Sequence, residues 1–303
     1  MTPVLATDLH KRLGDTEAVR GLDLEVEPGE LYGLVGPDGA GKTTTIRMLA
    51  GLMSPSAGTV RIEGRDSRER DLRERIGLVP QEHSLYGDLS IAENLAFYGS
   101  VFGLRRALFR ERRDELLAIT RLAPFTDRRA DALSGGMYKK LALACALLHQ
   151  PAVLFLDEPT NGVDPVSRRQ LWALLARFRE DGTTVVVSTP YMDEAARCHR
   201  VALMHEGRRI AEGRPGDLVN SMEDVVRRIE GGDRETLHRL LDESPGVVAA
   251  SPAGATLRVV LRPDAVESLA ERIEPLGGSL VPATPDFEDV FLATVAAAER
   301  GEA

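Results

Sequence analysis

The sequence predicts an α/β domain built on a largely parallel sheet, followed by a small α+β domain. Through the first two-thirds of the chain, short apolar runs alternate with amphipathic segments, which is typical of buried strands connected by helices. The expected strands are Leu31–Val35, Ile76–Val79, Val153–Leu156, Thr184–Ser188 and Val201–His205. The expected helices are Thr43–Ala50, Ile91–Phe102, Arg110–Ile119, Ser134–Leu148, Val166–Arg179 and Asp193–Arg197.

Two additions to this core are expected. Short β-type segments at Leu22–Val26 and Thr59–Ile62 predict an antiparallel addition on either side of the first helix. The section from Ser90 to Leu133 is mostly helical and stands between two expected strands. A helical subdomain is therefore predicted over about residues 84–150.

The character of the chain changes at Gly213-Arg214-Pro215-Gly216, which predicts a boundary between domains at residues 1–213 and 214–303. The elements expected after it follow the order β-α-β-β-α-β, typical of a ferredoxin-like α+β fold. They are Val225–Ile229, Glu235–Leu241, Val247–Ala250, Leu257–Leu261, Ala265–Ile273 and Leu280–Ala283, with a last helix at Phe287–Ala298.

Composition narrows the classes of function. The net charge of −9 and the pI of about 5.3 argue against broad nucleic-acid binding, which leaves a basic footprint, so no nucleic-acid partner is expected. The two cysteines, Cys145 and Cys198, form no C-x-x-C pair and are expected to be small buried hydrophobes in a reducing compartment. No secretory signal and no run of about eighteen apolar residues is present, so a membrane role would be peripheral.

The most informative segment is the loop from Gly36 to Thr43, which fits the pattern G-x-x-x-x-G-K-S/T between an apolar strand and a helix. Its glycines let backbone N–H groups turn inward on an anion, and the start of the helix adds a positive dipole end. Lys42 can then reach the β- and γ-phosphates, while the Thr43 hydroxyl can ligate Mg²⁺. ATP is expected to contact Gly36, Asp38, Gly39, Ala40, Gly41, Lys42, Thr43 and Thr44.

Two acids follow another apolar strand. Asp157 stands at the tip of Val153–Leu156, where a carboxylate beside a phosphate loop can hold Mg²⁺. The next residue, Glu158, is predicted to polarise the attacking water as general base.

A third motif, Leu133-Ser134-Gly135-Gly136-Met137, precedes a helix, with Ser134 as a good N-cap and two glycines that leave N–H groups open to an anion. In this place it resembles the L-S-G-G-x signature of ABC-type ATPases, and the resemblance runs from about Leu5 to Gly213. It implies ATP and Mg²⁺ as ligands, and a role for Gln81 in touching Mg²⁺ and transmitting the state of the site. It also implies that Asn161–Pro165 is the D-loop and that each ATP lies between two cassettes, one of which supplies Ser134, Gly135 and Gly136.

The tail, Asp286–Phe291, resembles the L-E-D-x-F motif of ATPase subunits of ABC-2-type drug and antibiotic exporters. Three positions depart from the family pattern. Pro190 stands where the family usually has a histidine, Leu13 stands where an aromatic residue stacks on adenine, and Lys139 replaces a glutamine after the signature.

The resemblance implies the ATP-hydrolysing subunit of a membrane exporter, at the cytoplasmic face of the membrane, with an integral membrane permease and a second cassette as partners. The loop and the Pro190 segment look most like the first cassette of fused two-cassette exporters. We therefore expect pairing with a different cassette, a homodimer being the alternative. A soluble ABC-type ATPase acting on nucleic acid or ribosomes is the other candidate, and a small-molecule kinase leaves the Leu133–Met137 motif unexplained.

Overall fold

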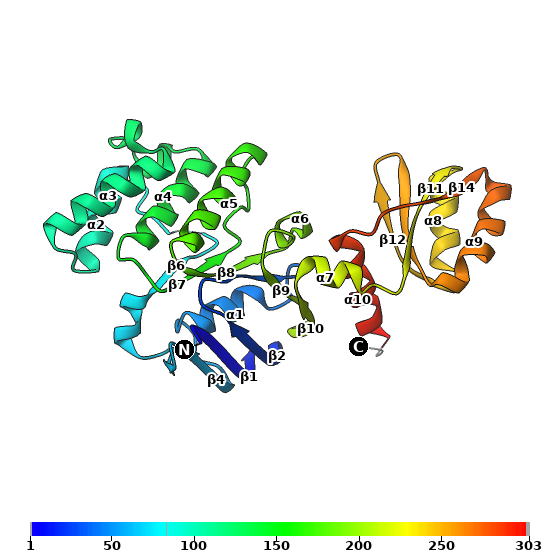
Figure 1. Cartoon of the computed structure of the whole chain (residues 1–303), viewed down its shortest axis with the longest axis horizontal. Coiled ribbons are helices and arrows are strands. Elements are labelled where there is room, and N and C mark those ends of the chain that lie inside the picture. Colours follow the sequence, from blue (N-terminus) through cyan, green and yellow to red (C-terminus); the bar gives the residue numbers. More distant parts are fainter. Residues whose placement is uncertain (1, 83, 301–303) are drawn as a thin grey trace. The chain divides into compact units, whose positions relative to one another are not determined.

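The computed structural model describes residues 2–82 and 84–300, and the chain divides into two compact units (Figure 1). The first unit comprises the chain up to Tyr191 together with Cys198–Arg209. The second comprises Met192–Arg197 together with the chain from Ile210 onward. The phosphate loop, the two acids and the signature all lie in the first unit.

The six-stranded sheet has the order β10-β9-β3-β8-β7-β6, and the five strands from β9 to β6 lie in the first unit. Strands β3 and β8, β3 and β9, β7 and β8, and β6 and β7 pair in parallel, so the predicted parallel core is confirmed. The five predicted strands are present because their apolar runs are buried on both faces, as a parallel sheet requires. The strands are β3 (Leu31–Val35), β6 (Ile76–Val79), β7 (Val153–Asp157), β8 (Thr184–Thr189), β9 (Arg200–His205) and β10 (Arg208–Gly213).

The predicted helices are present, with ends that differ from the prediction by at most four residues. Ser90 begins one of them through a reciprocal capping box with Glu93, and Asp164 caps another through the N–H groups of Val166 and Ser167. The helices up to residue 195 are α1 (Lys42–Leu49), α2 (Ile91–Val101), α3 (Arg106–Thr120), α4 (Gly135–Leu147), α5 (Pro165–Glu180) and α6 (Met192–Ala195), with 3₁₀ turns η1 (Arg70–Arg75), η2 (Ala123–Phe125) and η3 (Ala130–Ala132).

A second, antiparallel sheet in the order β2-β1-β4-β5 confirms the predicted β addition but is larger than expected. It comprises β1 (Val4–Leu13), β2 (Thr16–Val26), β4 (Ala57–Ile62) and β5 (Arg65–Asp66). The sequence did not predict β1, because polar residues such as Asp8, Lys11 and Arg12 interrupt its apolar alternation and its pairing with β2 shifts register. It matters here because β2 lies against the phosphate loop: the Ala18 carbonyl faces Gly41.

The second unit contains a four-stranded antiparallel sheet in the order β12-β13-β11-β14. Its elements follow the predicted β-α-β-β-α-β order, and α8 and α9 pack on one face, where Leu237, Leu241, Leu269 and Ile273 meet Ile229 and Val259. The elements are α7 (Pro215–Asn220), β11 (Val225–Gly231), α8 (Arg234–Asp242), β12 (Val247–Ala253), β13 (Thr256–Leu261), η4 (Pro263–Ala265), α9 (Val266–Ile273), η5 (Glu274–Leu276), β14 (Gly278–Pro282) and α10 (Phe287–Glu299).

The predicted motif in the tail begins α10. Asp286 caps the helix, and the buried Asp289 carboxylate accepts hydrogen bonds from Arg258 of β13 at 2.5 and 2.7 Å. The motif therefore fastens the last helix to the sheet. Among the helices of the described residues, none has the length and apolar character needed to cross a membrane.

Candidate nucleotide site

The phosphate loop is shaped by backbone that approaches it closely. A Cβ atom on Gly36 would lie 2.2 Å from the Met204 carbonyl oxygen, and one on Gly41 would lie 2.4 Å from that of Ala18. Gly41 also has a φ of 97°, a left-handed conformation that side chains disfavour. Glycine is required at both positions, and α1 begins directly after the loop, at Lys42.

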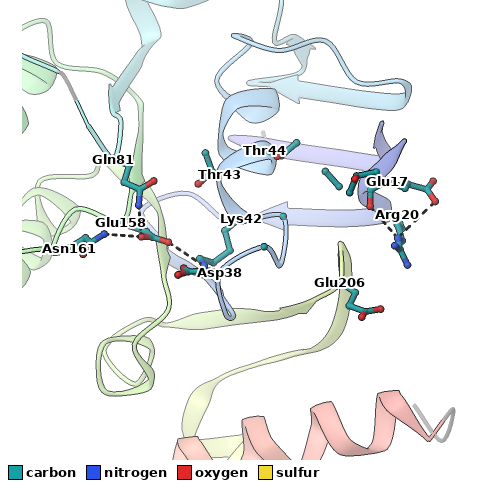
Figure 2. A pocket seen from close by; sticks show the side chains of 14 residues that line it. Glu17, Arg20, Asp38, Lys42, Thr43, Thr44, Gln81, Glu158, Asn161 and Glu206 are labelled. Carbon is teal, nitrogen blue, oxygen red and sulfur yellow. Dashed lines mark hydrogen bonds and ion pairs between the residues drawn. The ribbon is translucent and has the colours of Figure 1, made fainter. Parts of the chain in front are cut away.

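The loop borders a cavity of about 630 Å³, within the range of roughly 300–1,000 Å³ usual for small-molecule sites. Figure 2 shows Lys42, Glu158 and Gln81 on one side of it and Glu17, Arg20 and Glu206 on the other. Of the predicted residues, those that line it are Asp38, Gly39, Gly41, Lys42, Thr43, Thr44, Gln81 and Glu158. Gly36 and Ala40 stand behind the lining, where the Gly36 carbonyl accepts a hydrogen bond from Lys42.

Glu158 is held between a cation and an amide. Its Oε1 lies 3.3 Å from Lys42 Nζ, and its Oε2 accepts a hydrogen bond of 2.9 Å from Gln81 Nε2. Both charged side chains are almost fully buried, at 4% and 6% exposed, so each depends on the other for compensation. Glu158 also has a φ of 45°, a left-handed conformation that costs about 1–3 kcal/mol and is typical of functional sites.

The Asp157 carboxylate is hydrogen-bonded to two hydroxyl groups. Its Oδ1 accepts hydrogen bonds from the Thr43 hydroxyl at 3.1 Å and from the Ser188 hydroxyl at 2.7 Å. Ser188 in turn accepts from the Glu158 N–H at 2.9 Å. A carboxylate beside a hydroxyl is the donor chemistry that Mg²⁺ prefers, so these residues fit the predicted metal site.

The signature lies beside the predicted D-loop. Ser134 caps α4 by accepting from the Met137 N–H at 3.3 Å. A Cβ on Gly135 would lie 3.3 Å from the Gly162 carbonyl oxygen, and one on Gly136 would meet Ser167 at 2.3 Å. Ser134, Gly135 and Gly136 are not among the residues that line the cavity of their own chain.

The three departures from the family pattern fall in different places. Leu13 is 45% exposed and does not line the cavity, and neither does Pro190. Lys139 donates a hydrogen bond of 2.7 Å to the Gln81 carbonyl, and its burial lowers the pKa of its ammonium group. Lys139 therefore connects α4 to the segment that holds Glu158.

Sequence reasoning missed several residues of the site. Ser188 could have been found, since it ends the strand next to Asp157 and parallel strands bring their carboxyl ends to one edge. Asn161, expected only as part of the D-loop, also lies 3.5 Å from Glu158. No sequence signal marks the residues at the far end of the cavity, which are Thr16, Glu17, Ala18, Arg20 and Glu206.

Comparison with known proteins agrees with this geometry. The family model described as "ABC transporter" matches residues 19–161. The Nod factor export ATP-binding protein I of Cupriavidus metallidurans is 40% identical over 299 residues, covering 96% of this chain and 97% of the relative. The probable multidrug ABC transporter ATP-binding protein YbhF of Escherichia coli is 38% identical over 294 residues, covering 95% of this chain but 51% of YbhF. The chain thus spans about half the length of that relative.

A solved structure extends the comparison. The dimeric structure of the ATP-binding cassette MJ0796, bound to ADP and Pi in a post-hydrolysis state, superimposes with a TM-score of 0.64 at 27% identity. The match covers 70% of this chain and 98% of that one. Because it is 40% identical to a Nod factor export ATP-binding protein over nearly the full length of both, the chain belongs to the ATP-binding proteins of the ABC transporter family, whose members are ATPases.

Proposed function

We propose that this chain is the ATP-hydrolysing subunit of an ABC-2-type exporter, acting at the cytoplasmic face of a membrane. The observation that carries the proposal is the grouping of Lys42, Thr43, Gln81 and Glu158 along the cavity, with Asp157 hydrogen-bonded to Thr43. Relatives whose names include Nod factor export and multidrug transport, together with the tail motif, support export.

Different residues of the site would bind the phosphates, hold the metal ion and accept the proton. Loop N–H groups and Lys42 would bind the phosphates, and Thr43 and Asp157, with Gln81, would hold Mg²⁺, which would neutralise phosphate charge. Arrival of the γ-phosphate draws Lys42 away from Glu158. The carboxylate, still oriented by Gln81, would then face the attacking water and take up its proton as the water oxygen bonds to the γ-phosphorus. The bond from that phosphorus to the β–γ bridging oxygen would break, and ADP would leave.

The signature serves a second cassette. Because Ser134, Gly135 and Gly136 lie outside the cavity of their own chain, they are available to the nucleotide of a partner, and the dimeric relative supports such pairing. Pro190 has neither an N–H nor a polar side chain to offer the γ-phosphate. We infer that the partner is a different cassette and that this chain's own site hydrolyses slowly.

Two measurements test this pairing. The purified chain alone should hydrolyse ATP slowly, and Pro190→His should raise the rate. Brisk, cooperative turnover that Pro190→His leaves unchanged would point instead to a homodimer. Glu158→Gln should then double the mass seen by light scattering when ATP is added, whereas under our proposal the mass stays that of one chain.

A permease segment is the proposed occupant of a groove of about 440 Å³ formed by the end of α1, η1, β6 and α2. Leu52 and Val101 project into solvent at its rim, at 63% and 61% exposed. Two cations and one acid, Arg70, Arg73 and Glu74, also line it. Strand β6 forms part of this groove and ends two residues before Gln81. Movement of the bound permease segment would therefore be transmitted to the nucleotide site. Leu52→Asp should abolish co-purification of a membrane protein; retained co-purification would contradict this assignment.

The remaining assignments concern domains. We propose that residues 1–213 form the ATPase domain, with a helical subdomain at about 84–150, and that residues 214–303 form a ferredoxin-like accessory domain. The sheet order β12-β13-β11-β14 with two helices on one face supports the latter.

A further inference from the structure

The far end of the cavity is where the base of a nucleotide must lie. Lys42 and Glu158 mark the γ-phosphate end, and Figure 2 shows Glu17, Arg20 and Glu206 on the opposite side. This end is formed by β2 and by the turn between β9 and β10. Among the cavity-lining residues of the described chain, none is aromatic.

Leu13 does not fill that gap. Its side chain is 45% exposed at the end of β1 and is absent from the cavity lining. A base bound here therefore needs another flat surface. Among the described residues that line this end, Arg20 supplies the only planar cationic group, since Thr16, Glu17, Ala18 and Glu206 offer a hydroxyl, a methyl group and two anionic carboxylates.

Arg20 is fixed in position by local contacts. Its Nε donates a hydrogen bond of 3.2 Å to the Glu17 carbonyl, and the Glu17 carboxylate lies 4.0 Å away. Its backbone N–H donates to the Gly207 carbonyl at 2.8 Å, which ties β2 to the turn that carries Glu206. The side chain is about one-third exposed and lines the cavity.

Resting on the nucleotide site proposed above, we propose that Arg20, oriented by Glu17, is the platform on which the adenine ring stacks. A guanidinium is planar and weakly hydrated, and it stacks on aromatic rings and bases. Lysine lacks the plane, although it has the charge. The role is specific to the base and leaves phosphate binding to Lys42.

The test compares two ligands on the full chain, by calorimetry with Mg²⁺: ATP, and tripolyphosphate, which has the phosphates without the base. Arg20→Ala should weaken ATP binding roughly 5- to 150-fold, the range for loss of one base stack, and leave tripolyphosphate binding within about twofold. Arg20→Lys should lose nearly as much as Arg20→Ala. Leu13→Ala, the matched control, should bind both ligands as the parent does.

Three results would overturn the assignment: equal weakening of both ligands by Arg20→Ala, which makes Arg20 a phosphate contact; unchanged ATP binding in Arg20→Ala; or a loss in Leu13→Ala as large as that in Arg20→Ala. Failure of the parent chain to bind tripolyphosphate is a different outcome. It would remove the proposed phosphate site itself, and the role of Arg20 with it.

Discussion

Substitution of Asp289 by asparagine should release the last helix from the sheet of the second unit. The Asp289 carboxylate is 1% exposed, receives two hydrogen bonds from Arg258 at 2.5 and 2.7 Å, and accepts the Asp286 N–H at 2.8 Å. The Arg258 guanidinium is 21% exposed, and the Asp289 pairing raises its pKa. Asp289→Asn keeps the shape of the cap but leaves this cation facing a neutral amide.

The magnitude follows from that geometry. Breaking a buried ion pair by removing one partner costs about 3–5 kcal/mol. Arg258 is partly exposed and retains Asp286 at 3.2 Å, so the lower end of that range, about 3 kcal/mol, is expected. For a domain of about 60–100 residues, this corresponds to a fall in Tm of roughly 12–24 °C for the second unit.

Hydrogen exchange on the full chain measures the effect where it occurs. Amides of α10 should exchange about 150-fold faster in Asp289→Asn, while those of β7 in the first unit keep their protection. Glu288→Gln is the control, because it removes a neighbouring charge from an exposed position. Equal acceleration in both variants would refute the reasoning, since the loss would then reflect net charge at the start of the helix.

Three further outcomes are expected. Gly36→Ala places a Cβ 2.2 Å from the Met204 carbonyl and should lower the free energy of unfolding by about 1–3 kcal/mol, measured in urea; an unchanged midpoint would contradict it. Ser188→Ala leaves a buried backbone N–H unpaired and should also cost about 1–3 kcal/mol, whereas a loss below 0.5 kcal/mol, the order seen at surface sites, would show that another acceptor replaces it. Hydrogen bonds to the carboxylates of Asp8 and Glu17 raise the pKa of the His10 imidazole above 6.5. The stability that these bonds add is therefore fully present below pH 6.5 and disappears as the pH rises through the raised pKa. The NMR titration midpoint of its ring should therefore exceed 6.5 and fall in Asp8→Asn; a midpoint that the substitution leaves in place would assign the shift elsewhere.

How far the sequence could predict the fold depended on burial. Strands β3, β7 and β8 are continuous apolar runs, so their places and the acids that follow them, Asp157 and Glu158, could be predicted from pattern alone. Strand β1 could not, because its solvent-facing residues break the alternation. Arg20 illustrates the same limit in the site: it reaches the cavity from the second sheet, and no spacing in the chain relates it to the loop at Gly36.

The hydrogen bond between Lys139 and the Gln81 carbonyl connects two parts of the site. Helix α4 begins with the signature, and Lys139, in its first two turns, donates a hydrogen bond to the backbone of Gln81. The Gln81 side chain in turn orients Glu158. The 2.7 Å distance is that of a short hydrogen bond, so the start of α4 and the backbone at Gln81 are directly connected. If the signature contacts a partner's nucleotide as proposed above, this bond connects the contact made by one nucleotide to the glutamine that orients Glu158 beside the other.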